Sequence, residues 1–384
     1  MSFITSHKGL WALVIMAVAM LGAACGSDPT STAPAVNQPT QTPVIIEKEV
    51  TKFVEVETEK QVEVTKEVQV EVTKVVQVVA TPTPAPKDVI IFSDLNWDSI
   101  QLQNRIAMFI VENGYGYPVD TVTGNTISGF VGLEQGDMHV TMEIWLPNQQ
   151  VVWDKAIRRG DIQSVGSSLD DNWQSAFVIP TYVAEANPGL KTVADLKKPE
   201  YMNLFVTPDS RGKARLVTCV PGWECEKTNE NKIVAYGLED VIDLRNPGSG
   251  AGLFADLEGA YQRGDNWLGY LWGPTKPAAE LDLTLLEEPE YSDACWAADQ
   301  GCAYPSAAVL VAVHSSLPPR APDVVEFLRN WDFTAAAQVS AEGWMADNNE
   351  SVDAAALWYL ANQQDIWTQM VPADVASKII AALP

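Results

Sequence analysis

The chain has 384 residues and a formal net charge of −25 at pH 7, from 50 acidic and 25 basic residues. A surface this acidic excludes nucleic acid and anionic membrane as electrostatic partners. Residues 88–384 leave about 300 residues for folded structure, which suits two lobes or one large domain.

Residues 1–25 have the layout of a secretory signal peptide. His7 and Lys8 precede an apolar run at residues 10–20, too short for a membrane span, and small residues then lead to Cys25. These small residues resemble a bacterial lipobox, with Gly22 where an apolar residue is usual. The resemblance implies lipidation at Cys25 and an extracytoplasmic location, at the outer face of the cell membrane or in the periplasm. Ordinary cleavage and secretion is the alternative. No later segment is long and apolar enough to span a bilayer.

Residues 26–87 lack the composition of a folded domain. Residues 27–43 are rich in Ser, Thr, Pro and Gln, and a degenerate repeat of Val-Glu-Val and Val-Thr-Lys follows. Alternating valine and charge is typical of a strand, but an isolated strand has no sheet to join. We predict a disordered or extended tether that spans about 45 Å as a random coil, with a coiled or paired form as the alternative.

The pattern after residue 88 alternates between strands and helices. The first elements are expected as a strand at 89–92, an amphipathic helix at 100–113 ended by Gly114, and short elements at 119–122, 126–131 and 140–145. An apolar run at 177–183 ends this half. A second body then has a strand at 203–207, helices at 226–244 and 253–263, and a strand at 267–272.

A buried strand at 307–313 is the predicted point where the chain crosses back to the first body. Helices at 321–330, 332–341 and 352–362 complete that body. Such alternation predicts an α/β fold of mostly parallel sheets flanked by helices, with ligands at the carboxyl ends of strands. We expect lobe 1 at residues 88–180 and 305–384, lobe 2 at 181–304, and a ligand cleft between them.

Cysteine usage agrees with export from the cytoplasm. Four cysteines follow Cys25 in the chain: Cys219, Cys225, Cys295 and Cys302. They allow three pairings, of which local closure of each neighbouring pair is the simplest, and an oxidising compartment would preserve it. Neither pair has the short spacing of zinc ligands, and only His139 and His314 remain in the mature chain, so we expect no metal site.

Motifs of catalysis are absent from the sequence. It contains no G-x-S-x-G, H-E-x-x-H or G-x-x-x-x-G-K-[ST] motif, and no carboxylate pair stands out among so many acidic residues. Residues 209–213 have Arg and Lys where a calcium loop needs oxygen ligands. We therefore expect neither an enzyme nor a bound cofactor.

The segment Cys219-Val-Pro-Gly-Trp-Glu-Cys225 is expected to turn at Pro221-Gly222 and to present Trp223 just before a helix. The apolar face of that helix is marked by residues spaced three and four apart: Ile233, Val234, Gly237, Leu238 and Val241. An aromatic face attracts cations and a helix N-terminus attracts anions. The segment therefore predicts a site that holds both ends of a zwitterion.

Four of the thirteen tryptophans stand at strand ends or turns: Trp97, Trp145, Trp223 and Trp272. Side chains at the carboxyl ends of strands converge on a cleft. A box of indole rings recognises quaternary ammonium, each contact contributing about 0.5–2 kcal/mol. The alternative is that each ring only packs within its own loop.

The pattern Cys-x-Pro-Gly-Trp-x-Cys-Glu, then a helix and a strand ending in Tyr-x-Trp-x-Pro, resembles the glycine betaine (osmoprotectant) substrate-binding proteins of ABC transporters. The resemblance spans nearly all of residues 88–384 and extends to further short motifs: Asn203-Leu-Phe-x-Thr, Gly212-Lys-Ala, Leu216-Val-Thr-Cys219, Glu143-Ile-Trp-Leu-Pro147 and Gly114-Tyr. The valine-rich tether after a lipobox is similar to that of envelope-anchored binding proteins.

This resemblance implies a two-lobed fold of the periplasmic-binding-protein type, type II-like, that closes on its ligand. Carried onto matching positions, Trp145, Trp223 and Trp272 would cage a trimethylammonium group. The backbone amides of Glu224 and Cys225 would bind a carboxylate. Trp97, after the first strand, is a further candidate for the site.

Two positions depart from the family pattern. Gln149 stands where some members have a histidine that helps to hold the carboxylate, and it offers a neutral donor instead. Glu224 stands where some members have glycine; its side chain can point away, but a carboxylate near the cage favours a plain cation such as choline.

The predicted function is that of an extracytoplasmic substrate-binding lipoprotein for a quaternary-ammonium solute, glycine betaine first. A separate permease and ATPase of an ABC importer would be its partners, since the chain has neither membrane spans nor a P-loop. The alternatives are a choline, carnitine or amino-acid receptor of the same fold, a secreted carbohydrate-binding protein, and a sensory receptor. A carbohydrate-active site needs two facing carboxylates, which the sequence does not nominate.

Overall fold

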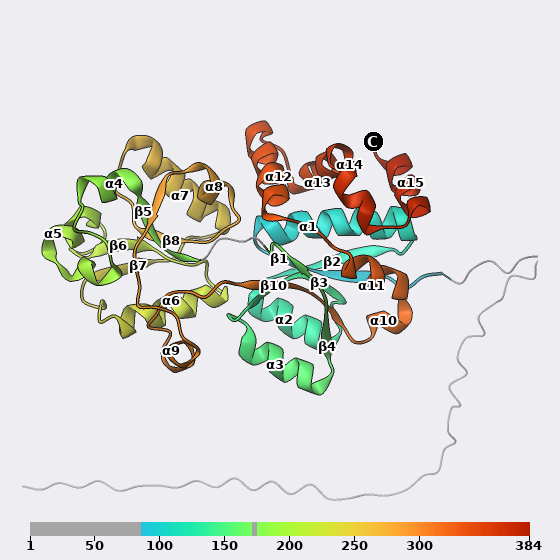
Figure 1. Ribbon diagram of the computed structural model, residues 1–384, viewed down its shortest axis with the longest axis horizontal. Helices are drawn as coiled ribbons and strands as arrows, with labels where there is room; N and C mark the ends of the chain where they lie inside the picture. The colour runs from blue at the N-terminus through green and yellow to red at the C-terminus, as the bar shows by residue number, and fades with distance from the viewer. Residues whose placement is uncertain (1–85, 171–174) are drawn as a thin grey trace, which may run out of the picture. The chain divides into compact units, whose positions relative to one another are not determined.

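The computed structural model of this protein describes residues 86–170 and 175–384 (Figure 1). The predicted signal peptide, lipobox and most of the tether lie outside the described residues. Within the described part, no helix is long and apolar enough to cross a bilayer, and no group of His, Cys, Asp and Glu side chains is placed to hold a metal ion.

The first sheet has five strands in the order β2-β1-β3-β10-β4. Their bounds are β1 Ile90–Leu95, β2 Val119–Gly124, β3 Val140–Leu146, β4 Ile162–Ser168 and β10 Ala308–His314. β1 pairs in parallel with β2 and β3, whereas β10 runs antiparallel to β3 and β4. The predicted return of the chain at residues 307–313 is therefore confirmed, because β10 completes this sheet.

Helices cover both faces of the first sheet (Figure 1). On one face lie α2 Thr126–Gln135 and α3 Gln150–Arg159. The opposite face carries α1 Asp98–Phe109, which continues as a π-helix at Ile110–Tyr115, and helices from the C-terminal part of the chain. The helices after β10 are α10 Leu317–Arg320, α11 Pro322–Arg329, α12 Ala335–Asn348, α13 Val352–Asn362, α14 Gln364–Trp367 and α15 Ala373–Ala382, with a short 3-10 turn at Thr368–Met370.

The sequence predicts that Gly114 ends the first helix, but in the structure it does not. The π-helical turn extends to Tyr115, and Gly116 stops it with a φ of +72°. Gly114 serves close packing instead, since a Cβ there would lie 2.7 Å from Cγ1 of Val375 in α15. The tether prediction also needs adjustment at its end, because Lys87 already packs on the body and donates to the Tyr115 carbonyl at 2.7 Å.

The second sheet has the order β7-β6-β8-β5-β9. Its strands are β5 Ala176–Pro180, β6 Ala214–Val217, β7 Ile242–Arg245, β8 Gly269–Leu271 and β9 Leu283–Leu285. β6 pairs in parallel with β7 and β8, while β5 runs antiparallel to β8 and β9. The helices of this half are α4 Thr181–Ala186, α5 Pro199–Met202, α6 Glu224–Ala235, α7 Gly250–Arg263, α8 Lys276–Glu280 and α9 Asp293–Ala298, with 3-10 turns at Val193–Lys197 and Asn203–Phe205.

The predicted fold class is confirmed: two α/β halves, each with a mostly parallel sheet and one antiparallel strand. The expected lobe boundary at residue 180 is wrong for one strand, because β5 belongs to the second sheet. Every residue of β5 is buried, so its apolar run carries no signal for the sheet that it joins.

Two predicted elements differ from the structure, and the short element expected at 126–131, for which no type was predicted, is helical. Residues 126–131 form the start of α2, which begins at an Asn125/Ser128 capping box. The expected strand at 203–207 is a 3-10 turn followed by extended chain. The expected helix at 226–244 stops at Ala235, and Gly237, with a φ of +61°, turns the chain toward β7. Helical spacing of apolar residues had concealed this break.

Both disulfides close locally, as Cys219–Cys225 and Cys295–Cys302. The second loop is fastened to α6 by Lys232, whose ammonium group donates to Oε1 of Glu288 at 2.9 Å and to the carbonyl of Cys302. Lys232 is fully buried, and its Nζ lies 4.5 Å from the centroid of the Tyr304 ring. This buried ion pair ties the region after α9 to the helix that follows Trp223.

Candidate ligand-binding site

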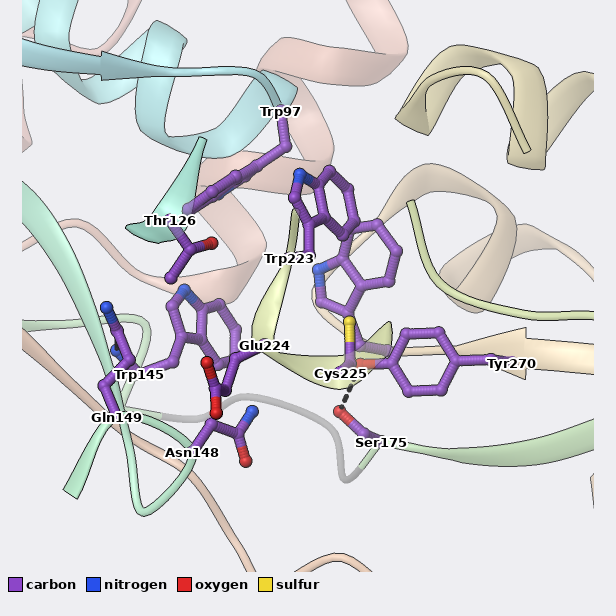
Figure 2. Close-up of a pocket in the computed structure, with 11 residues that line it drawn as sticks. Trp97, Thr126, Trp145, Asn148, Gln149, Ser175, Trp223, Glu224, Cys225 and Tyr270 are labelled. Carbon is purple, nitrogen blue, oxygen red and sulfur yellow. Dashed lines mark hydrogen bonds between the residues drawn. The ribbon is translucent and has the colours of Figure 1, made fainter. Parts of the chain in front are cut away.

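One pocket is lined by residues from both sheets (Figure 2). All seven residues that the sequence nominated for ligand binding line it: Trp97, Trp145, Gln149, Trp223, Glu224, Cys225 and Trp272. Four more lining residues were not nominated: Thr126, Asn148, Ser175 and Tyr270. The structure thus brings the predicted site residues together.

The tryptophans of the first half, Trp97 and Trp145, are held by one buried carboxylate. Trp97 precedes α1 as its N-cap residue, and Trp145 lies near the end of β3. The Nε1 groups of both indoles donate to Oε2 of Glu143, each at 2.8 Å. Since Oε1 of Glu143 accepts from Nε2 of Gln103 at 2.7 Å, the carboxylate fixes both rings.

The tryptophans of the second half, Trp223 and Trp272, meet at nearly a right angle. Their ring centroids are 5.2 Å apart with an interplanar angle of 85°. Trp223 also meets Trp97 edge to face, at 5.5 Å and 74°. Because stacked rings would hide their faces from a ligand, this perpendicular arrangement suits a pocket with several aromatic walls.

The turn closed by Cys219–Cys225 contacts the first half of the protein directly. Nε1 of Trp223 donates to Oδ1 of Asn96 at 2.7 Å. Gly222, with a φ of +85°, lies so close to Asn125 that a Cβ would be 2.6 Å from its Nδ2. A left-handed backbone and this close approach both require glycine.

Hydrogen bonds hold the same turn in addition to the disulfide. The amide of Gly222 donates to Oε2 of Glu226 at 2.9 Å. Nδ2 of Asn246 donates to the carbonyl of Cys219 at 3.1 Å and to Oε1 of Glu226 at 3.0 Å. The turn is therefore fixed on both sides before any ligand arrives.

Helix α6 begins at the pocket with Glu224 and Cys225. Its N-cap residue is Trp223, which has no side-chain oxygen and makes no capping hydrogen bond. The first amides of a helix have no partner inside it, and the helix dipole adds partial positive charge there. This end of the pocket can accept an anionic group, as the sequence predicted.

The two residues that depart from the family pattern take different roles. Oε1 of Gln149 accepts the backbone N–H of Trp145 at 2.9 Å, which leaves Nε2 as the group that can donate to a ligand. The Glu224 side chain lines the pocket, and in Figure 2 its carboxyl points toward the part lined by Asn148. Burial raises the pKa of Glu224, so its neutral form is favoured more than in water.

Sequence reasoning missed the supports of the aromatic walls. Tyr270 stacks on Trp272 with centroids 6.0 Å apart, and its hydroxyl donates to Oγ of Ser175 at 3.2 Å. Tyr304 packs on Tyr270 at 5.7 Å. Tyr270 lies in the quoted Tyr-x-Trp-x-Pro motif, which could have pointed to it, whereas no local pattern points to Ser175.

Two α/β halves and a pocket lined from both of them define a two-lobed substrate-binding protein. The family model described as "Substrate binding domain of ABC-type glycine betaine transport system" matches residues 88–362. The chain therefore belongs to this family, whose members are binding proteins and not enzymes.

Similar proteins of known name bind related solutes. The chain is 25% identical over 293 residues to the trimethylamine N-oxide-binding protein of Pelagibacter ubique (strain HTCC1062), covering 73% of this chain and 90% of that protein. It is 29% identical over 166 residues to the glycine betaine/proline betaine-binding periplasmic protein of Escherichia coli (strain K12), covering 42% and 49%. The second match thus spans about half of that relative.

Solved structures agree with the fold. An ABC-transporter choline-binding protein in complex with choline has a TM-score of 0.62 at 20% identity, over 77% of this chain and 98% of the other. Lactococcal OpuAC, closed on glycine betaine, has a TM-score of 0.58 at 17% identity, over 74% and 100%. At these identities the matches establish the two-lobed architecture.

Proposed function

We propose that this protein binds a small quaternary-ammonium solute, glycine betaine first, in the pocket between its two halves. The observation that carries the proposal is the convergence of four indole rings, Trp97, Trp145, Trp223 and Trp272, on one pocket. A trimethylammonium group is a weakly hydrated cation that gains about 0.5–2 kcal/mol from each aromatic face when desolvated.

The polar end of the pocket suits a carboxylate. The free amides at the start of α6 and Nε2 of Gln149 supply donors without a full positive charge. A ligand whose carboxylate binds there keeps that anionic group away from the aromatic walls. Glycine betaine has this layout, with a cation and a carboxylate joined by one methylene group.

Glu224 supports choline as the second candidate. An ionised carboxylate in the pocket repels the carboxylate of betaine and attracts the uncharged hydroxyl tail of choline as an acceptor. Burial raises the pKa of Glu224. The neutral acid does not repel the carboxylate of betaine, and its O–H group can donate a hydrogen bond to it. The ionisation of Glu224 therefore decides between the two ligands.

Closure of the two halves on the ligand would complete the cage. The contact of Trp223 with Trp97 and Asn96 joins the halves at the pocket, so a ligand that bridges these rings favours the closed state. We propose that the closed protein delivers its ligand to a separate permease and ATPase. Its place would be outside the cytoplasm, held to the membrane by lipid on Cys25, in line with relatives named as periplasmic proteins.

Isothermal titration with a panel of solutes tests this proposal. The panel consists of glycine betaine, choline, carnitine, trimethylamine N-oxide, proline and an oligosaccharide. We expect saturable binding of at least one quaternary-ammonium solute, accompanied by a change in tryptophan emission, because the ligand contacts the indoles directly. Binding of the oligosaccharide with no response to any ammonium solute or N-oxide would show that the proposal is wrong.

A further inference from the structure

Glu143 is a buried carboxylate at the back of the pocket, outside the set of residues that line it. Its side chain is 1% exposed. Oε2 accepts the indole N–H groups of Trp97 and Trp145, and Oε1 accepts Nε2 of Gln103. A single side chain thus sets the ring orientation of both aromatic walls from the first half.

The direction of these three hydrogen bonds favours an ionised carboxylate. An indole N–H can only donate. Gln103 cannot turn its oxygen toward Glu143, because its Oε1 already accepts from Nε1 of Trp331 at 2.9 Å and from Oγ of Ser168 at 2.6 Å. Trp97, Trp145 and Gln103 therefore each present a donor to Glu143, and these three hydrogen bonds are stronger when the carboxyl is ionised.

Burial and hydrogen bonding act on this carboxyl in opposite directions. Burial raises the pKa of Glu143 and outweighs the hydrogen bonds from Ser99, Trp145, Trp97 and Gln103, which lower it. The ionised form is therefore costly in the empty pocket. Within the described part of the chain, no ion pair includes Glu143. A buried anion without a cationic partner is costly, so a positive charge in the pocket would relieve an existing imbalance.

The indoles transmit this charge to the pocket. A ring whose N–H donates to an anion gains electron density, because hydrogen bonds in a poorly solvated interior polarise their partners. A more negative π-face attracts a cation more strongly. Trp97 and Trp145 therefore present to the ligand faces that are enriched in negative potential by Glu143.

We infer that Glu143 is a positioning and specificity-determining residue, which orients Trp97 and Trp145 and makes the pocket select a cation over a neutral molecule of the same shape. The inference rests on the proposed function, since it concerns the same pocket and the same class of ligand. It adds the residue that converts an aromatic pocket into a cation-selective one.

The test compares choline with its uncharged carbon isostere, in which a tert-butyl group replaces the trimethylammonium group. The shapes are the same and only the charge differs. For the unaltered protein we expect a preference for choline of about 100-fold or more, from several cation–π contacts. In Glu143→Gln we expect the affinity for choline to fall by about tenfold or more, while the affinity for the isostere changes little. The ratio of the two affinities therefore becomes smaller.

Two further variants separate charge from positioning. Glu143→Asp keeps the charge but is one methylene shorter. It should therefore lower the affinity for both choline and its isostere and preserve the ratio between them. Glu342→Gln removes another buried carboxyl, 5% exposed, whose hydrogen-bond partners are the Lys276 backbone and Gln338, and it should leave the ratio unchanged. Far-UV circular dichroism and thermal unfolding check that each variant is folded.

An unchanged choline-to-isostere ratio in a folded Glu143→Gln variant overturns the inference, whatever happens to absolute affinity. Should that variant not fold, Trp145→Phe keeps an aromatic wall but removes one donor to Glu143, and a ratio equal to that of the unaltered protein then has the same meaning. If the unaltered protein binds none of the ammonium solutes, the proposed function itself fails. The two failures are therefore distinguishable.

Discussion

Replacement of Trp223 by alanine is expected to lower the affinity for a quaternary-ammonium ligand by about 100-fold or more. The ring is the central wall of the pocket, in edge-to-face contact with Trp97 and Trp272. Its loss removes one cation–π contact, frees two neighbouring rings and breaks the hydrogen bond to Asn96. Isothermal titration with glycine betaine and choline measures the effect.

The matched control for this substitution is Trp344→Ala. Trp344 stacks on Trp358, with centroids 5.4 Å apart, where α12 packs against α13. This substitution removes the same side chain and should change stability without changing affinity. If Trp223→Ala binds as tightly as the unaltered protein, the aromatic pocket is not the binding site.

A second large effect is expected at Glu342, whose substitution by glutamine should remove a loss of stability that develops between pH 4.5 and about 8. Burial raises the pKa of Glu342 to about 8, and repulsion by Asp98 adds to the shift. Hydrogen bonds from Gln338 and from the backbone N–H of Lys276 oppose it, and Glu143 repels it more weakly.

The sign of the pH effect follows from the raised pKa. Between the ordinary value of 4.5 and about 8, the folded state keeps a proton that the unfolded state releases. Stability from this group is therefore complete below pH 4.5 and is lost as the pH rises through 8, with a slope of up to about 1.4 kcal/mol per pH unit. A glutamine at this position has no such slope.

Glutamine also fits the local hydrogen bonds at position 342. Its oxygen can accept the backbone N–H of Lys276, and its amide nitrogen can donate to Oε1 of Gln338 once that side-chain amide is turned about its own axis. That oxygen is buried without a partner. The substitution therefore leaves the packing intact and removes only the ionisable group.

Urea unfolding from pH 5 to pH 9 checks this prediction. We expect the free energy of unfolding of Glu342→Gln to rise relative to that of the unaltered protein as the pH rises, by on the order of 3 kcal/mol between pH 5 and pH 9. Asp98 remains in both proteins, and its own pKa is also raised by burial, so some slope persists. Parallel stability curves for the two proteins would contradict the prediction.

The aromatic and disulfide parts of the site could be predicted from the sequence because each carries a local signal. Trp145, two residues before Pro147, and Trp223, within Cys219–Cys225, were expected at a strand end or turn, and strand ends meet at one edge of a sheet. Neighbouring cysteines close short loops. These features depend on contacts that are close in sequence or fixed by the fold class.

The polar supports of the site could not be predicted in the same way. Glu143 precedes Trp145 by two residues, yet its link to Gln103 and Trp97 depends on how α1 packs against β3. One acidic residue among fifty has no composition signal. The assignment of β5 failed for a similar reason, since an apolar run does not reveal its partner strands.

The two sheets share one order when the strands of each half are numbered separately. The strand that directly follows a passage of the chain between the halves, β10 or β5, is left out of the count, so that β1 and β6 are the first strands. Across both sheets the order is then second, first, third, the uncounted strand, and fourth: β2-β1-β3-β10-β4 and β7-β6-β8-β5-β9. The halves are thus two copies of one topology. The pocket lies where equivalent ends of these copies meet.

The four tryptophans occupy equivalent places in the two copies. Trp97 and Trp223 are each the N-cap residue of the helix after the first strand. Trp145 and Trp272 each stand at the end of the third strand, in the sequence Trp-x-Pro. The proposed cation site is therefore built from one arrangement that occurs twice, once in each half.

The groups for the other end of the ligand have no such duplication. Glu224 lines the pocket, whereas Asp98, at the equivalent first position of α1, does not. Gln149 likewise has no counterpart among the lining residues of the second half. In the proposed complex, the head group would contact tryptophans from both halves, and the tail would contact single residues. Substitutions at those single positions can change which tail is accepted while recognition of the cation stays intact.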